Sequence, residues 1–373
     1  MDNQYKTAYT FETDIDKAVS DLKRKLAASD AALILFFASS NYDAAKLSTT
    51  FAASFAGVTT VGCTTSGEII TGKMLDNSIV AICFSNAILA DVKVEVVQDV
   101  TKNPHAVKEA FKGFESHFNV SMQEMDHNRF IGIVLTDGLS GTEEVVMDKI
   151  GDLTNITFIG GSTGDDLKFK ETHVFYNGKS YTNASLLLLM KPSVAFSILK
   201  TQSFTSTGRK LVVTKVVEEE RKVIEFNNKP ATVAYAEALG VSVDELSKVM
   251  FYNPLGLMAD DEPFVRSPRL IEGTSMYFYC SVKEGMELDL LNSTDIIQDT
   301  ADALLKKKEE TGDISALINF NCILRTLDLK QQNRTKEYGD LFKDFPTIGF
   351  STYGESLIGH MNQTATMLVF SKS

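Results

Sequence analysis

Three short runs of β-forming apolar residues recur along the chain, and a turn rich in glycine and threonine follows each of them. The runs are residues 32–37, 130–135 and 314–320. From the last residue of the run to the first glycine of the turn there are 25 residues in the first two cases and 29 in the third. A spacing of this size has room for a strand, a helix and a second strand. The pattern therefore predicts repeated β-α-β modules that arose by internal duplication.

The segments between these runs carry helix and strand patterns of their own. Apolar residues recur at helical spacing over residues 44–55, after the N-cap candidates at 39–41, and Ser140 and Glu143 have capping-box spacing. Residues 193–226 alternate apolar and polar side chains, which predicts antiparallel strands. The whole pattern predicts an α/β protein of mixed sheets with helices packed on their faces. We expect two interleaved halves, residues 25–220 and 221–372.

The repeated turn has the features of a small-ligand site. Its three copies read VGCTTSGE at 61–68, IGGSTGDD at 159–166 and IGFSTYGE at 348–355. Such a sequence lets the backbone turn tightly, exposes successive N–H groups and adds hydroxyl groups. A single copy is explained equally well as a tight strand connection. With three copies, we expect the turns to lie at equivalent strand ends and at least two of them to line a shared cavity.

Composition narrows the class of function. The 373 residues carry a formal net charge of −12, and no basic stripe offers a surface for nucleic acid. The longest apolar runs, 31–38 and 186–190, are too short to cross a membrane. The four cysteines have no paired spacing that would predict disulfides or a zinc site. We therefore expect a cytoplasmic protein without membrane insertion.

Taken in order, the motifs resemble those of a known family. Residues 62–68 and 160–165 are similar to the N-terminal half of the FIST domain, and 265–268, 321–325, 349–355 and 362–364 resemble its C-terminal half. The resemblance covers roughly residues 25–370. It implies a stand-alone sensory module of bacterial signal transduction that binds a small molecule such as an amino acid. No segment resembles an output domain, so we expect signalling to a separate protein such as a histidine kinase.

Sixteen residues of these motifs are candidate ligand-binding groups. They are Gly62, Cys63, Thr64, Thr65, Glu68, Gly161, Ser162, Thr163, Arg266, Asn321, Arg325, Ser351, Thr352, Tyr353, Glu355 and Asn362. Arg266 and Arg325 have the guanidinium fork that clamps a carboxylate, although arginines in solvated or interdomain salt bridges have the same sequence appearance. Glu68 and Glu355 are placed to receive an ammonium group.

Two other functions stay open at this point. Some stand-alone members of the family bind haem and sense nitric oxide, and they regulate a histidine kinase. Members often have a histidine directly before Asn-Gln-Thr, where this chain has Met361, with His360 one residue earlier; these two are the candidate axial ligands. Catalysis by Cys63, with Asp137 or Glu68 as acid or base, lacks a histidine in a recognisable motif. We expect a binding protein without a cofactor, not an enzyme.

Overall fold

The computed structural model describes residues 5–27, 30–259 and 262–372 as a mixed α/β protein with four sheets. The chain divides into two compact units. The first contains the described residues up to Thr201, together with Thr300–His360 and those from Ala365 onward. The second contains Gln202–Asp299 and Met361–Thr364, so it is an insertion in the first. This division differs from the ranges 25–220 and 221–372, which stay a prediction.

Three six-stranded sheets make up the first unit, and all three follow one strand plan. Each has two parallel strands in the middle, two further strands on one side and a short hairpin on the other. The first sheet contains, in spatial order, β1 (Tyr5–Thr10), β6 (Ile79–Ser85), β2 (Ala31–Ser39), β3 (Thr59–Thr65), β10 (Val174–Tyr176) and β11 (Lys179–Tyr181). The second contains β7 (Leu89–Gln98), β12 (Ala184–Pro192), β8 (Ile131–Thr136), β9 (Phe158–Ser162), β24 (Glu355–Leu357) and β25 (Gly359–Met361). The third contains β13 (Phe196–Gln202), β26 (Thr364–Ser371), β22 (Ile314–Cys322), β23 (Thr347–Thr352), β4 (Glu68–Ile70) and β5 (Lys73–Leu75).

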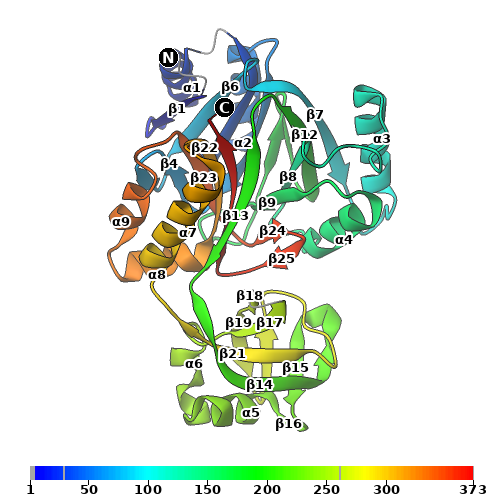
Figure 1. Ribbon diagram of the computed structural model, residues 1–373, viewed down its shortest axis with the longest axis vertical. Helices are drawn as coiled ribbons and strands as arrows, with labels where there is room; N and C mark the ends of the chain where they lie inside the picture. Colours follow the sequence, from blue (N-terminus) through cyan, green and yellow to red (C-terminus); the bar gives the residue numbers. More distant parts are fainter. Residues whose placement is uncertain (1–4, 28–29, 260–261, 373) are drawn as a thin grey trace. The chain divides into compact units, whose positions relative to one another are not determined.

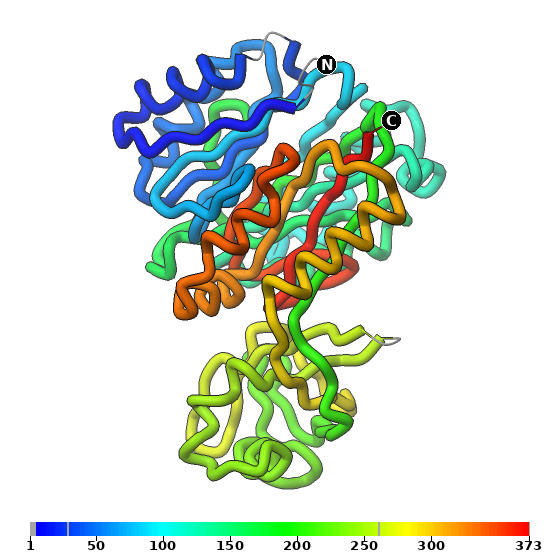
Figure 2. Tube along the Cα trace, turned by 60° about the vertical axis from the view of Figure 1, so that its left-hand side comes forward, coloured from blue at the N-terminus to red at the C-terminus, as the bar shows by residue number. Residues whose placement is uncertain are grey.

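The hairpin of each sheet is contributed by a different part of the chain. Strand β4 follows β3 in sequence but pairs with β23 of the third sheet. In the same way β10 follows β9 but pairs with β3, and β24 follows β23 but pairs with β9. The three sheets are therefore linked in a ring by exchanged hairpins. Figure 2 shows the resulting chain path, with the red strand β26 between β13 in green and β22 in orange.

An apolar core shared by the three sheets lies on their inner faces. Side chains such as Phe37, Ile133 and Phe320, each from a central strand, belong to one buried cluster. Helices cover the outer faces: α1 (Ile15–Leu26) and α2 (Ala44–Ser54) pack on the first sheet, and α3 (Ala106–Phe118) and α4 (Glu143–Leu153) on the second (Figure 1). The first unit also contains α8 (Ile323–Gln331) and α9 (Thr335–Asp340), together with α7 (Ile296–Thr311) from Thr300 onward. This arrangement confirms the expected mixed sheets with helices on their faces.

The first glycine of each repeated turn has the same position in its sheet. These glycines lie opposite a residue of the neighbouring parallel strand, in the pairs Gly62 with Phe36, Gly160 with Val134 and Gly349 with Asn319. A Cβ added to them would stand 2.2, 1.8 and 2.1 Å, respectively, from the carbonyl oxygen of that partner. No side chain tolerates such a contact without movement of the backbone. Close approach of two strands is thus sufficient reason for the glycine in the motif.

The second unit is built on an eight-stranded sheet that nearly closes into a barrel. Its strands are β18 (Glu262–Arg266), β17 (Leu255–Ala259), β21 (Glu287–Ser293), β14 (Phe204–Val217), β15 (Lys222–Phe226), β20 (Ser275–Phe278) and β19 (Pro268–Glu272), with β16 (Lys229–Pro230) beside β15. The helices α5 (Ala231–Leu239) and α6 (Leu246–Val249) accompany it, and Tyr235 of α5 is buried in its core. The expected antiparallel strands at 193–226 are confirmed.

Two expected helix caps are wrong. Helix α2 is capped by Asp43, which accepts from the backbone N–H of Lys46, and not by residues 39–41. Helix α4 has no capping box, because the Ser140 hydroxyl donates to the carbonyl of Asp137 instead. No helix within the described residues is long and apolar enough to cross a membrane.

Candidate functional site

The three repeated turns meet at the carboxyl ends of β3, β9 and β23. Between the first and third turns, the Ser351 N–H donates to the Gly67 carbonyl at 2.8 Å. Between the third and second, the Ser162 N–H donates to Gly354 at 2.8 Å; between the second and first, the Gly164 N–H donates to Thr64 at 3.1 Å. The turns thus lie at equivalent strand ends, as expected. At these contacts their backbone groups bind one another, and a cavity shared by the turns stays a prediction.

The turns also fit together without space for added atoms. A Cβ on Gly164 would stand 2.3 Å from the Ser66 hydroxyl oxygen, and one on Gly161 would stand 2.6 Å from the Thr352 side chain. Because glycine is needed for this packing, the glycines and hydroxyl groups of the motif already have a structural role. Some of its polar side chains bind neighbouring backbone groups: the Thr163 hydroxyl accepts from the Gly138 N–H at 3.0 Å, whereas the buried Ser162 hydroxyl has no hydrogen-bond partner among the residues that the structure describes.

The acids after the first and third turns are buried. Both Glu68 and Glu355 have 0% of their surface exposed, and each accepts a hydrogen bond from the threonine three residues earlier, Thr65 or Thr352. Glu68 also accepts from the backbone N–H and hydroxyl of Ser78, at 3.0 and 2.6 Å. Burial raises the pKa of Glu68 to about 8, despite hydrogen bonds that oppose the rise. Glu68 and Glu355 therefore face the protein interior, and a role for them in ligand binding stays a prediction.

The second turn continues into a surface loop, residues 163–173, which is tied to Tyr353. The Tyr353 hydroxyl donates to the Asp165 carboxylate and accepts from the Leu167 N–H at 2.9 Å. Asp165 also accepts from three backbone N–H groups of the loop. Burial opposes ionisation of Asp165, but these hydrogen bonds hold its pKa below the usual value. The Phe169 ring, 62% exposed, stacks on Tyr353 with 5.3 Å between the ring centroids.

The backbone of this loop is strained. Asp166, Leu167 and Phe169 have φ values of 56°, 61° and 50°, in the left-handed region that large side chains rarely adopt. Residues in such conformations persist where surrounding contacts hold them, and they are frequent in ligand clamps. Here the hydrogen bonds to Asp165 and Tyr353 supply those contacts.

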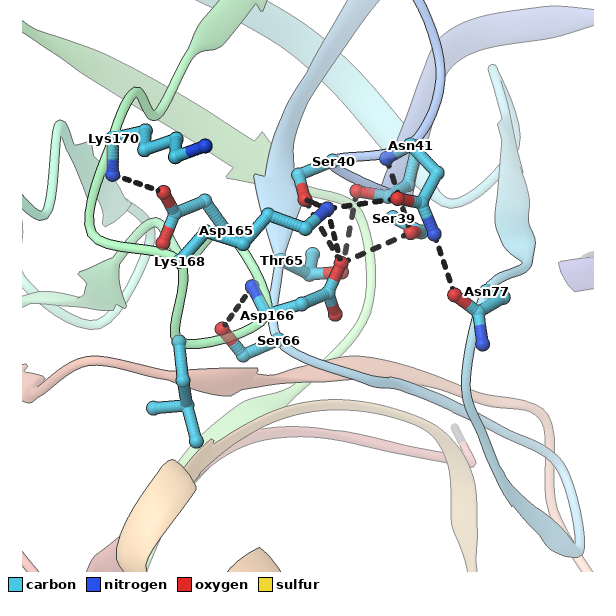
Figure 3. A network of polar contacts seen from close by, with 12 residues as sticks. Ser39, Ser40, Asn41, Thr65, Ser66, Asn77, Asp165, Asp166, Lys168 and Lys170 are labelled. Carbon is cyan, nitrogen blue, oxygen red and sulfur yellow. Dashed lines mark hydrogen bonds and ion pairs between the residues drawn. The ribbon is translucent and has the colours of Figure 1, made fainter.

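A network of polar side chains, the Asp166 network, lies where this loop meets the end of β2 (Figure 3). It consists of Ser39, Ser40, Asn41, Asp166 and Lys168. The Asp166 carboxylate accepts from the Ser40 and Ser39 hydroxyls at 2.8 and 3.2 Å and lies 3.7 Å from the Lys168 ammonium. Lys168 also donates to the Ser40 hydroxyl at 2.9 Å and to the Asn41 side-chain oxygen at 2.7 Å. The Lys168 and Asp166 side chains are 42% and 24% exposed, so both charges reach solvent.

Sequence reasoning missed the Asp166 network. The sequence features that could have indicated it are Ser39 and Ser40, after the first apolar run, and Asp165 and Asp166, at the end of the second turn. The serines were interpreted as helix caps, and nothing local links them to an aspartate 126 residues away.

The candidate residues Asn321 and Arg325 belong to a buried network beside the third turn. Arg325, 2% exposed, donates to Asn321 at 3.0 Å and to the Thr300 hydroxyl at 2.9 Å. Asn321 donates to the Thr326 hydroxyl, which contacts the Ser351 hydroxyl at 2.7 Å. Arg325 therefore has a structural role here, and a role in ligand binding stays a prediction.

The remaining candidates lie in other surroundings. Arg266 and Asn362 belong to the second unit, where Arg266 donates to the Ser281 carbonyl at 3.1 Å and Asn362 accepts from the Cys280 thiol at 2.7 Å. Cys63 is fully buried in β3, and burial raises the pKa of its thiol. A thiol in this environment is a poor nucleophile.

The haem alternative depends on His360 and Met361, and both side chains are buried, at 6% and 0% exposed. The His360 ring packs directly over Gly354, and its Nε2 lies 3.8 Å from the Glu143 carboxylate. The haem alternative, with these two residues as axial ligands, stays a prediction. No group of three or more histidine, cysteine or acidic residues suited to a metal ion occurs within the described ranges.

Comparison with known proteins identifies the class of this chain. Residues 32–229 match the FIST N domain and residues 231–357 match the FIST C domain. The chain therefore belongs to the FIST family, as the motifs indicate.

Other similarities are more distant. An uncharacterized protein of Methanocaldococcus jannaschii is 24% identical over an alignment of 290 residues that covers 67% of this chain. The chain spans 55% of that relative's length. Among solved structures, a T. maritima PurL complexed with AMPPCP is 12% identical, with 100% of this chain and 74% of that chain covered. Its TM-score is 0.18, too low to carry an argument about the fold.

Proposed function

We propose that this FIST chain is a sensory protein that binds a small zwitterionic ligand of amino-acid type at the Asp166 network and signals to a separate protein. One observation carries the proposal. A partly exposed ammonium and a partly exposed carboxylate stand 3.7 Å apart, with two hydroxyl groups beside them, at the carboxyl ends of parallel strands. Ligands of open α/β sheets are commonly bound at that edge.

The chemistry of the Asp166 network matches both ends of an amino acid. A ligand carboxylate can take the place of Ser40 or Asn41 as a partner of the Lys168 ammonium, and the Asp166 carboxylate can receive the ligand ammonium. The Ser40 hydroxyl can donate or accept as the ligand requires. The adjoining Phe169 ring, stacked on Tyr353 and largely exposed, offers an apolar surface for a ligand side chain.

The proposal is tested by thermal shift and isothermal titration against a panel of L-amino acids. We expect at least one of them to raise the melting temperature, because a ligand that binds only the folded state stabilises it. Lys168→Gln should weaken that ligand by about tenfold, the loss expected for one charged hydrogen bond of about 1.5 kcal/mol. Lys170→Gln is the matched control, since it removes the same charge from the same loop. No binder in the panel, or equal effects of the two substitutions, would refute the proposed site.

The signalling part of the proposal needs its own test. A sensor must bind its ligand more tightly in one state than in another, whereas an enzyme would convert it. We expect the ligand to be recovered unchanged after incubation, as NMR would show. We also expect the autophosphorylation rate of a partner histidine kinase to differ between ligand-free and saturated protein. An unaltered rate under both conditions would argue against this partner class.

We further infer that the three sheets of the first unit derive from one repeated module. Support comes from their common strand order, from the three glycines in the same register and from the equivalent donated hairpins. Such a repeat explains why one short motif occurs three times and why its copies meet. Under this interpretation the second unit is an insertion after the first strand of the third module.

A further inference from the structure

A polar pocket lies in the first unit, lined by none of the residues of the Asp166 network. Its volume is about 390 Å³, and its lining includes Lys6 and Thr7 of β1, Lys25 of α1, Thr71 after β4, and Lys343 and Asp344 before β23. Three lysines therefore face one aspartate in the lining, although the protein as a whole has a net charge of −12. A local excess of positive charge on an acidic protein requires a specific explanation.

The lysines of this pocket differ in how they are neutralised. Lys25 pairs with Asp21 at 2.5 Å and donates to the Tyr9 carbonyl at 2.9 Å. Lys6 has a single long contact, 3.4 Å to the carbonyl of Ala27. Within the described part of the chain, neither Lys6 nor Lys343 forms an ion pair with a carboxylate. Two ammonium groups at one pocket thus remain available to an anion.

The two threonines add a hydrogen-bond donor. The hydroxyl oxygens of Thr7 and Thr71 are 3.1 Å apart, and the Thr71 oxygen accepts from the Thr347 N–H at 3.0 Å. Two hydroxyl groups have two hydrogens, and the contact between them uses only one. The second hydrogen is therefore free to bind a ligand oxygen in the pocket.

We propose that this pocket binds a small phosphate-type anion, held by Lys6, Lys343 and the threonine pair. Ammonium groups on flexible stems suit a phosphate because they act as point charges and need no fixed two-point geometry. The small number of lysines and the acidic surroundings favour a small molecule over a nucleic-acid strand. Thr71 follows β4, the strand that begins with Glu68, so the anion would contact the hairpin donated by the first turn.

Isothermal titration with inorganic pyrophosphate at constant ionic strength tests this proposal, with malonate as a dicarboxylate comparison. We expect pyrophosphate to bind more tightly than malonate. The double substitution Lys6→Gln/Lys343→Gln should weaken it by about tenfold, because each exposed ion pair contributes about two- to fivefold. Lys102→Gln is the control, since Lys102 is 81% exposed and outside the pocket lining.

The possible results are decisive in either direction. Because the substituted lysines lie at the surface, unchanged circular dichroism and melting temperature would show that the variants fold. Absent heat with pyrophosphate, tighter binding of malonate, or an equal loss in Lys102→Gln would overturn the proposal. These outcomes are independent of the amino-acid titrations, which use another probe and other variants.

Discussion

Replacement of Glu68 by glutamine should make the protein more stable at neutral and alkaline pH. Glu68 is buried, and its pKa is raised from 4.5 to about 8 mainly by desolvation. The Thr65 hydroxyl contacts both the Ala38 carbonyl, at 3.2 Å, and the Glu68 Oε1, at 2.5 Å. That hydroxyl has one hydrogen: it donates to Glu68 when the carboxyl is charged, and it can donate to Ala38 only when a protonated Glu68 carboxyl donates to Thr65 instead. Protonated Glu68 satisfies this pattern, and glutamine reproduces its donor and acceptor.

The sign and size of the effect follow from linkage between protonation and folding. A folded-state pKa above the unfolded value means that the stabilising contribution is complete below pH 4.5 and is lost as the pH rises toward 8. At about 1.4 kcal/mol per pH unit, this 3.5-unit interval corresponds to about 5 kcal/mol in the free energy of unfolding. About 2–3 kcal/mol of it falls between pH 6 and 9. Over that range the wild-type protein should lose this amount relative to Glu68→Gln.

Urea denaturation of both proteins at several pH values between 6 and 9 measures the difference directly. Taking the difference removes the contributions of all other titrating groups, and Glu309→Gln controls for the loss of a carboxylate outside the core. A constant difference across this range would refute the reasoning, because it would mean that folded Glu68 is already charged at pH 6. A large loss of stability in Glu68→Gln at pH 6 would have the same meaning, since only the charged form would require all its donors.

Two further substitutions test the structural roles assigned to motif residues, with chemical denaturation as the measurement. Gly160→Ala should lower the free energy of unfolding by about 3 kcal/mol, the upper part of the range for overpacking, because its Cβ would stand 1.8 Å from the Val134 carbonyl oxygen. The control is Gly151→Ala, whose Cβ would have no atom within 4 Å, and this substitution should be neutral or slightly stabilising. Equal effects of these two would contradict the packing argument. Arg325→Ala should cost about 3 kcal/mol because Arg325 is buried and makes charged hydrogen bonds, whereas the half-buried Arg266→Ala should cost about 1 kcal/mol or less. A stable Arg325→Ala variant would return Arg325 to the candidate ligand groups.

Local sequence patterns correctly predicted the helices and strands whose formation depends on residues close together in the chain. The apolar runs became β2, β8 and β22 because their side chains are buried on both faces of a covered sheet. The spacing to Gly62, Gly160 and Gly349 was informative because helix and strand fill it in each case: α2 and β3, then α4 and β9, and finally α8, α9 and β23. These features depend on residues that are near one another in the chain.

Features that depend on distant partners were not visible. Nothing in the three residues of β4 indicates that they pair with β23, almost 280 residues later. The motif acids were interpreted as ligand groups, and only the fold shows that Glu68 and Glu355 are buried. Residues 39–41 had good N-cap composition, yet the Ser39 and Ser40 hydroxyls bind Asp166, which left the cap of α2 to Asp43.

The ring of exchanged hairpins gives the proposed sensor a physical route for its response. Two of the donated hairpins follow their turns directly, because β4 begins immediately after Gly67 and β24 immediately after Gly354, whereas the loop 163–173 separates the second turn from β10. A ligand at the Asp166 network would contact the loop that leads into β10, and β10 pairs with β3, the strand of the first turn. The loop follows β9 of the second sheet but leads into β10 of the first sheet. A shift of the loop therefore acts on the first sheet. The other two donated hairpins link the first sheet to the third and the third to the second in the same way. We therefore expect the three turns to change conformation together. Such a change between two states is what a ligand that binds one state more tightly requires.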